Sequence, residues 1–222
     1  FAEMAEEYLS GIENIVFIGT RPPVSFFAYP GKKSFLSPEG AKLIEVANVY
    51  QDGKYALSCL NDLCKGKKID ERFLPSGTID APQSGDLSVD NLGPLMASLL
   101  PEDTIMSNEA GTSGFIFASH VWNAKPCDWL SITGGSIGQG IPVATGAAVA
   151  APDRPVVCLQ GDGGAMYTIQ SLWTQAREGL NVTNVIFSNK SYAILQVELE
   201  RVGALKTGDR AKSMLSMDNP EI

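Results

Sequence analysis

The chain has 222 residues, of which 44% are hydrophobic and 19% charged, a composition typical of a folded globular protein rather than a disordered one. Its 17 Lys and Arg residues and 25 Asp and Glu residues give a formal net charge of −8. This acidic balance argues against nucleic acid or an anionic membrane surface as the main partner. No apolar run in the sequence approaches the roughly 18–20 residues that a membrane span requires.

The start of the chain and its cysteines bear on location. The chain begins at Phe1 with no charged-then-apolar leader, so we expect a cytoplasmic protein whose natural N-terminus is missing here. No two cysteines have the close spacing of a zinc site or a redox motif. All lie in or near apolar stretches, so we expect buried free thiols and a reducing compartment. These residues are Cys59, Cys64, Cys127 and Cys158.

The hydrophobic pattern divides the chain into two α/β units joined by a linker. The first unit, residues 1–72, is predicted to contain a helix, two strands and a helix, at residues 2–10, 14–19, 42–47 and 52–65. This pattern is too short to close a core of its own. Residues 73–88 are predicted to form the linker, because they are rich in Pro, Gly and Ser and poor in apolar anchors.

The second unit, residues 89–222, alternates helices and strands. Helices are predicted at residues 89–100, 141–151 and 167–178, and strands at residues 104–107, 129–133, 155–160 and 182–188. This alternation predicts an α/β fold with a doubly wound, mostly parallel sheet and helices on both faces. Ligands bind such sheets at the carboxyl ends of the strands. We therefore expect a site around residues 134–140, 161–165 and 189–192.

A glycine-rich loop at residues 134–140 follows a predicted strand and precedes a helix, as a dinucleotide-binding fingerprint would. The spacing fails, because Val143 stands where a third small residue is needed for close helix packing. A P-loop is also absent from the sequence, since no Gly is followed by Lys and a hydroxyl residue at the required distance. Taken alone, the loop equally suits a tight turn between strand and helix.

Two polar side chains follow neighbouring predicted strands. Asp162 lies in Gly161-Asp162-Gly163, and Asn189 comes after 25 further residues. A lone Gly-Asp-Gly also suits an ordinary turn, but adjacent parallel strands would bring Asp162 and Asn189 to one edge of the sheet. Their oxygens, with a backbone carbonyl from the loop after Asn189, suit Mg²⁺ or Ca²⁺ and not zinc.

The charge of this arrangement indicates the kind of ligand. One carboxylate cannot neutralise a divalent cation, so the missing negative charge should come from the ligand, most simply a diphosphate. The helix after the loop, with its first turn expected near Gly164, would direct backbone N–H groups and the positive end of its dipole at that anion. Gly163 and Gly164 would let the backbone approach closely.

These residues resemble the signature of thiamine diphosphate (ThDP)-dependent enzymes: Gly161-Asp162-Gly163, 25 residues and then Asn189. Residues 109–113, Glu-Ala-Gly-Thr-Ser, resemble the loop that touches the diphosphate in the decarboxylase and synthase branch. The loop at 134–142 resembles the one beneath the central bend of the cofactor. Residues 89–222 thus resemble the diphosphate-binding domain, incomplete at its C-terminus, and residues 1–72 the end of the central domain. The acetolactate synthase-like and benzoylformate decarboxylase-like branches are the most similar.

The resemblance implies a role for individual residues. Mg²⁺ would be bound by the side chains of Asp162 and Asn189 and by the carbonyl of Ser191. The residues implied to line the cofactor's diphosphate are Gly111, Thr112, Gly163, Gly164, Ala165 and Tyr192. The Gly135 carbonyl would accept a hydrogen bond from the amino group of the pyrimidine ring. The Ile137 side chain would lie under the cofactor and hold it bent, which makes proton removal at the thiazolium ring intramolecular.

Two departures from the family pattern concern substrate and branch. Leu195, implied to face the substrate, stands where pyruvate decarboxylases of the family place an acidic group, which argues against that branch. Residues 196–202 lack the Trp found near this point in anabolic acetolactate synthases, so the biosynthetic assignment is open. The family's catalytic histidines come from other regions, so we expect His120 to be structural.

The resemblance implies ThDP- and Mg²⁺-dependent decarboxylation or carboligation of a small-molecule 2-keto acid. One alternative is a 2-hydroxyacyl-CoA lyase or oxalyl-CoA decarboxylase, and another is a non-catalytic ThDP-binding or scaffold protein. The glutamate that activates the cofactor belongs to an N-terminal domain that nothing in this sequence resembles. We therefore expect a piece of a longer enzyme, inactive alone, that works as a homodimer or homotetramer. FAD on the central domain stays open.

Overall fold

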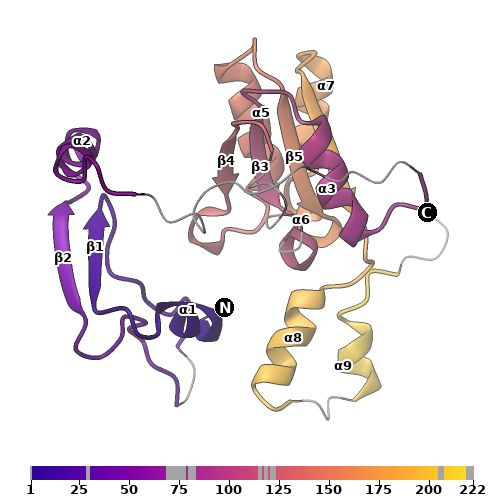
Figure 1. The fold of residues 1–222 in the computed structure, drawn as a ribbon. Helices are drawn as coiled ribbons and strands as arrows, with labels where there is room; N and C mark the ends of the chain where they lie inside the picture. The colour runs from indigo at the N-terminus through magenta and orange to yellow at the C-terminus, as the bar shows by residue number, and fades with distance from the viewer. Residues whose placement is uncertain are drawn as a thin grey trace. The chain divides into compact units, whose positions relative to one another are not determined.

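The computed structural model describes residues 2–28, 31–68, 79, 84–114, 117, 120, 124–204 and 208–218. The chain divides into two compact units, residues 1–71 and residues 72–222 (Figure 1). None of the helices in these residues is both long and apolar enough to cross a membrane.

The first unit is a small parallel α/β element. It contains α1 (Ala2–Leu9), β1 (Asn14–Ile18), β2 (Lys42–Ala47) and α2 (Gly53–Leu63). The two strands pair in parallel, and Phe17, Leu36 and Ala47 are buried. Asp52 caps α2, because its carboxylate accepts a 2.9 Å hydrogen bond from the Tyr55 N–H. All four predicted elements of this unit are confirmed, to within two residues at their ends.

The second unit is built on a parallel sheet of four strands in the order β4-β3-β5-β6. The strands are β3 (Ile105–Glu109), β4 (Asp128–Ser131), β5 (Val156–Gly161) and β6 (Val182–Phe187). The helices are α3 (Val89–Leu99), α5 (Gly140–Ala150), α6 (Asp162–Thr168), α7 (Ser171–Arg177), α8 (Ala193–Arg201) and α9 (Asp209–Ser213), with short 3₁₀ turns η2 (Gly111–Ser113) and η3 (Thr133–Gly135).

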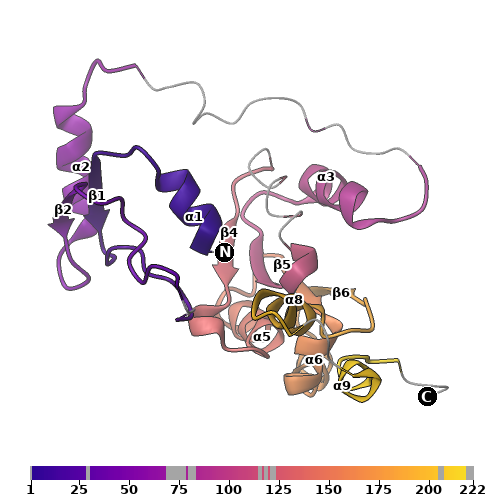
Figure 2. The same ribbon diagram turned by 90° about the horizontal axis from the view of Figure 1, so that it is seen from below.

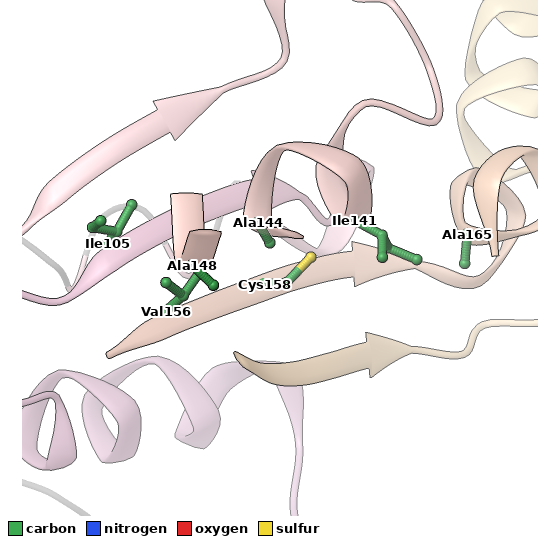
Figure 3. Close-up of a cluster of buried hydrophobic side chains, with 7 residues drawn as sticks. All are labelled: Ile105, Ile141, Ala144, Ala148, Val156, Cys158 and Ala165. Atoms are coloured by element: carbon green, nitrogen blue, oxygen red, sulfur yellow. The ribbon is translucent and has the colours of Figure 1, made fainter. Parts of the chain in front are cut away.

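Helices pack on both faces of this sheet. Alternate side chains of β5 point to opposite faces, and they belong to two different buried clusters. Val156 and Cys158 belong to a buried cluster with Ile141 and Ala144 of α5 (Figure 3). The side chains between and after them belong to a second cluster, which contains Leu100, Met106, Phe117, Val157 and Leu159. In Figure 2 the strands lie between α3 and α5. The predicted doubly wound α/β fold is confirmed.

One predicted helix is interrupted in the structure. In place of a helix over residues 167–178, the structure has α6 and α7, joined by a tight turn. Hydrogen bonds of the i→i+3 type bridge the turn, from the Leu172 N–H to the Ile169 carbonyl and from the Trp173 N–H to the Gln170 carbonyl. Helix α6 begins at Asp162, directly after β5, earlier than the first turn predicted near Gly164.

The cysteine prediction is half wrong. Cys158 is fully buried and Cys127 partly buried, but Cys59 and Cys64 are exposed. Both exposed thiols lie on α2 or at its C-terminal end, and α2 contains no buried residue. The small first unit offers too little surface to cover more than one side of this helix. The thiols are free, as expected.

Candidate functional site

A cavity of about 420 Å³ opens at the carboxyl ends of the parallel strands in the second unit. The predicted site residues that line it are Gly111, Thr112, Gly135, Ile137, Asp162, Gly163, Gly164, Asn189, Ser191, Tyr192 and Leu195. Ala165 is the exception. Its side chain is buried in the core cluster under α5, so only its backbone could serve a ligand. The cavity thus opens at the edge of the sheet where the alternation of strands and helices predicted a site.

Asp162 joins the ends of β5 and β6, which pair directly. Its Oδ2 accepts a 2.8 Å hydrogen bond from the Lys190 N–H and a 3.3 Å bond from the Ser188 hydroxyl. Its Oδ1 accepts a 2.9 Å bond from the Gly163 N–H. Lys190 has a positive φ of 53°, a left-handed conformation that turns the chain back after Asn189. The expected meeting of the two strand tips is confirmed.

The loop after β6 presents oxygen atoms to the same cavity. Asn189 Oδ1 accepts a 3.0 Å hydrogen bond from the Ser191 N–H, which fixes the amide within the loop. The Ser191 hydroxyl donates to the Leu215 carbonyl at 3.2 Å. Both Asn189 and Ser191 line the cavity beside Asp162.

A segment near the end of the chain, residues 214–217, supports this loop and was not predicted. The Tyr192 N–H donates to the Leu215 carbonyl at 2.9 Å, and the Met217 N–H donates to the Lys190 carbonyl at 2.7 Å. An antiparallel bridge also pairs Ser191 with Ser216. Met214 of the same segment lines the cavity. No local sequence pattern predicts this pairing, because the two paired segments are about 25 residues apart in the sequence.

Tyr192 lies against the backbone at Gly163. A Cβ atom placed on Gly163 would lie 2.9 Å from Cε1 of Tyr192 and 3.3 Å from the Met217 sulfur. Any side chain at this position would therefore displace the Tyr192 ring. The contact explains why glycine follows the carboxylate here.

The glycine-rich loop forms the other side of the cavity. Gly134, Gly135 and Gly138 all have positive φ, at 62°, 67° and 93°, which side chains rarely adopt. Ile137 is 53% exposed and lines the cavity. Ile137 belongs to neither core cluster, so its exposed apolar side chain is available to contact a ligand in the cavity.

Glu109 also lines the cavity and was missed as a site residue. The sequence placed it in a loop after a strand at residues 104–107, but β3 continues through Glu109. Its side chain is buried, with 8% of its surface exposed. Glu109 is the charged residue of a strand that otherwise contains Ile, Met, Ser and Asn, and a charge at the end of a buried strand was the available signal.

The cavity carries negative and neutral groups. No Lys, Arg or His occurs among the described residues that line it, and His120 instead packs against Gly93 of α3. The described residues contain no group of three or more His, Cys, Asp and Glu side chains suited to a metal ion.

Residues 109–220 match the thiamine pyrophosphate enzyme family, C-terminal TPP binding domain. The chain belongs to this family. The matched region begins at Glu109 and contains Asp162, Asn189 and both glycine loops, so the predicted resemblance to ThDP-dependent enzymes is confirmed.

Individual members of the thiamine pyrophosphate enzyme family match more of the chain. IlvX of Mycobacterium tuberculosis, whose name classes it provisionally as an acetolactate synthase large subunit, is 43% identical over 99% of this chain and 42% of its own length. Benzoylformate decarboxylase of Pseudomonas aeruginosa is 30% identical over 55% of this chain and 23% of its own.

A solved structure of the family shows the same fold. The ThDP-dependent 4-hydroxybenzoylformate decarboxylase of Rhodococcus jostii RHA1 superposes with a TM-score of 0.73 and 25% identity, over 97% of this chain and 42% of its own. The chain thus spans about two fifths of the length of this structure and of the mycobacterial relative.

Proposed function

We propose that this chain carries the diphosphate-binding part of an enzyme that uses ThDP and Mg²⁺ to decarboxylate a 2-keto acid, to join its product to a second carbonyl compound, or both. The observation that carries the proposal is the position of Asp162. Its carboxylate lies where β5 and β6 end and is held against the loop that carries Asn189. Family membership supplies the identity of the cofactor.

The Mg²⁺ ligands in this proposal are the Asp162 carboxylate, the Asn189 amide oxygen and the Ser191 carbonyl. Hard oxygen donors of this kind suit Mg²⁺, which keeps remaining positions for water and phosphate oxygens. All three residues line one cavity. Because no basic side chain is found among the described lining residues, the cation would supply the charge that lets an acidic site accept a diphosphate.

The diphosphate would lie along backbone rather than side chains. Gly111, with φ of 58°, and Thr112 line one side of the cavity, and Gly163, Gly164 and Tyr192 line the other. Ala165 would contribute its backbone N–H alone. Gly111, where an added Cβ atom would meet nothing within 4 Å, leaves room for phosphate oxygens to approach the main chain.

The glycine-rich loop would hold the rings. The Gly135 carbonyl would accept a hydrogen bond from the pyrimidine amino group, and the Ile137 side chain would support the bend of the cofactor. When bound, ThDP supplies the electron sink for the decarboxylation of a 2-keto acid. The chain's part is to position it and to exclude water.

The substrate side of the cavity is apolar. Ile194, Leu195 and Met214 line it without a charged group, which favours a 2-keto acid with an apolar side chain. The names of the relatives fit this class, because benzoylformate and 4-hydroxybenzoylformate are aromatic 2-keto acids. We expect Leu195 to contact the substrate's side chain.

We further propose that the intact protein is a homodimer or homotetramer. Helices α6 and α7 and the turn between them expose Met166, Tyr167, Ile169 and Trp173, apolar surface that suits an interface between subunits. Light scattering on the intact protein would measure the assembly, and a monomer at micromolar concentration would contradict this part of the proposal.

The function is tested by calorimetry and product analysis on the intact protein. We expect ThDP to bind in the presence of Mg²⁺ and to bind far more weakly with EDTA. We then expect CO₂ release from benzoylformate to exceed that from pyruvate, with ligation products assayed in the same samples. ThDP binding without CO₂ release from any 2-keto acid would favour a non-catalytic role, and release from an acyl-CoA substrate alone would favour a CoA-dependent lyase.

A further inference from the structure

The loop of residues 134–140 lacks a regular pattern of its own and is held from outside. Its internal backbone bonds are short turns, from the Ser136 N–H to the Thr133 carbonyl and from the Gln139 N–H to the Ser136 carbonyl. Glycines at positive φ give it many accessible conformations. The Gln139 side chain bonds the loop to Thr133 and Ser131, and bonds from other elements complete the selection of the conformation in which Ile137 lines the cavity.

Glu109 holds the loop in this conformation through two hydrogen bonds. Its Oε1 accepts a 2.5 Å hydrogen bond from the Gly138 N–H, and its Oε2 accepts a 2.5 Å bond from the Gly140 N–H. One carboxylate at the end of β3 thus bonds to two alternate amides of a loop about thirty residues later. Hydrogen bonds to a charged acceptor are stronger than neutral ones, and Gly140 is also the first residue of α5, where a negative charge is favourable.

The space around the carboxylate is shaped for it. A Cβ atom on Gly140 would lie 2.8 Å from Cβ of Glu109, and one on Gly164 would lie 2.8 Å from its Oε1. Two glycines from different elements therefore make room for the neighbouring side chains of Glu109 and Gln160. Its burial next to the ends of α5 and α6 excludes water that would otherwise compete for the loop amides.

A second bond restrains the same loop from α6. The Thr168 hydroxyl donates to the Gly138 carbonyl at 2.7 Å. Gly138 is thus held by its N–H to β3 and by its carbonyl to α6. The loop is connected to two of the elements that surround the cavity.

We propose that Glu109 is a positioning residue for the cofactor. It holds the backbone of residues 138–140 so that the Gly135 carbonyl and the Ile137 side chain keep the arrangement that the cofactor's rings require. This inference rests on the proposed function for its ligand, but the restraint of the loop is a property of the chain alone. Both carboxylate oxygens are engaged by loop amides, so the role argued here is to position the loop.

The test uses Glu109→Gln in the intact protein. The amide keeps the size of the side chain but offers one acceptor in place of two, so one loop amide loses its partner. By hydrogen-exchange mass spectrometry we expect amides of residues 134–140 to exchange at least about tenfold faster, with β5 unchanged. By calorimetry with Mg²⁺ present we expect ThDP to bind about tenfold more weakly or worse.

The matched control is Gln175→Leu. Gln175 is also buried and hydrogen-bonded, but to Thr145 and Asn184, away from the loop. We expect it to lower stability without altering loop exchange or ThDP affinity. If the Gln variant does not fold, Glu109→Asp takes its place, because the shorter side chain keeps the charge but cannot reach both amides.

The outcomes separate this inference from the proposed function. Unchanged loop exchange in the Glu109 variant overturns the inference, and so does faster exchange with undiminished ThDP affinity. If the wild-type protein itself binds no ThDP, the proposed function fails. The exchange experiment still measures whether Glu109 restrains the loop.

Discussion

Asp162 accepts a hydrogen bond from the backbone N–H of Lys190 at 2.8 Å. This bond connects the ends of two adjacent parallel strands, and it places the carboxylate beside Asn189. The same side chain thus organises the loop and presents charge to the cavity, so its substitution should affect both.

Asp162→Asn tests the charge with little change in shape. We expect ThDP affinity in the presence of Mg²⁺ to fall at least about a hundredfold, because the cation loses its only anionic protein ligand in this proposal. Calorimetry measures the affinity, and Asp153→Asn, at an exposed turn, is the control. Binding that persists at the wild-type level with metal present would refute the metal assignment.

Gly163→Ala tests the contact with Tyr192. The new methyl group would lie 2.9 Å from the Tyr192 ring, so the ring must move and the cavity wall with it. We expect ThDP to bind about tenfold more weakly, with a loss of stability of about 1–3 kcal/mol.

Gly146→Ala is the matched control for that substitution. A Cβ atom on Gly146 would meet nothing within 4 Å, and the residue lies inside α5. We expect this variant to gain about 0.5–1 kcal/mol in the free energy of unfolding and to bind ThDP normally. Equal binding losses in both alanine variants would show that the Tyr192 contact is not the cause.

The buried thiol of Cys158 should make the folded protein less stable at alkaline pH. Burial, and secondarily the charge of Glu109, raises the pKa of its thiol from 9.0 to about 12. The unfolded chain therefore loses this proton at lower pH than the folded one. The contribution to stability is complete below pH 9 and is lost as the pH rises towards about 12.

Urea unfolding of wild type and Cys158→Ala measures this contribution. From pH 8 to about 10.5, we expect the wild type to lose about 2 kcal/mol more than the alanine variant. Parallel pH dependences would contradict the prediction. A thiol reagent at pH 8 should also label the exposed Cys59 and Cys64 and leave Cys158 unmodified in the folded protein.

Gln175 connects α7 to α5 and β6. Its amide donates to the Thr145 hydroxyl at 2.9 Å and accepts from the Asn184 amide at 2.7 Å. Gln175→Leu leaves both groups without this partner, and we expect the free energy of unfolding to fall by about 1–3 kcal/mol. Adding Asn184→Val should restore part of the loss in denaturant titrations, since it removes one of the orphaned groups. An additive double variant would argue against the coupling.

The sequence determined the fold class and the place of the site because both follow from local periodicity. Apolar runs such as 155–160 closely predicted β5, and the rule for parallel sheets then placed Asp162 and Asn189 at neighbouring strand ends. The loop motifs also indicated the family, because each motif is a short run of residues that can be read directly from the sequence.

Only the tertiary structure decided which distant groups meet. The bonds from Glu109 join a strand end to the loop at 138–140, and residues 214–217 pair with the loop after β6. Neither contact follows from strand periodicity or from the rule for parallel sheets. The break between α6 and α7 and the exposure of Cys59 and Cys64 likewise depend on what packs against each helix. The burial of a residue depends on the segments that pack against it, and those segments lie elsewhere in the sequence.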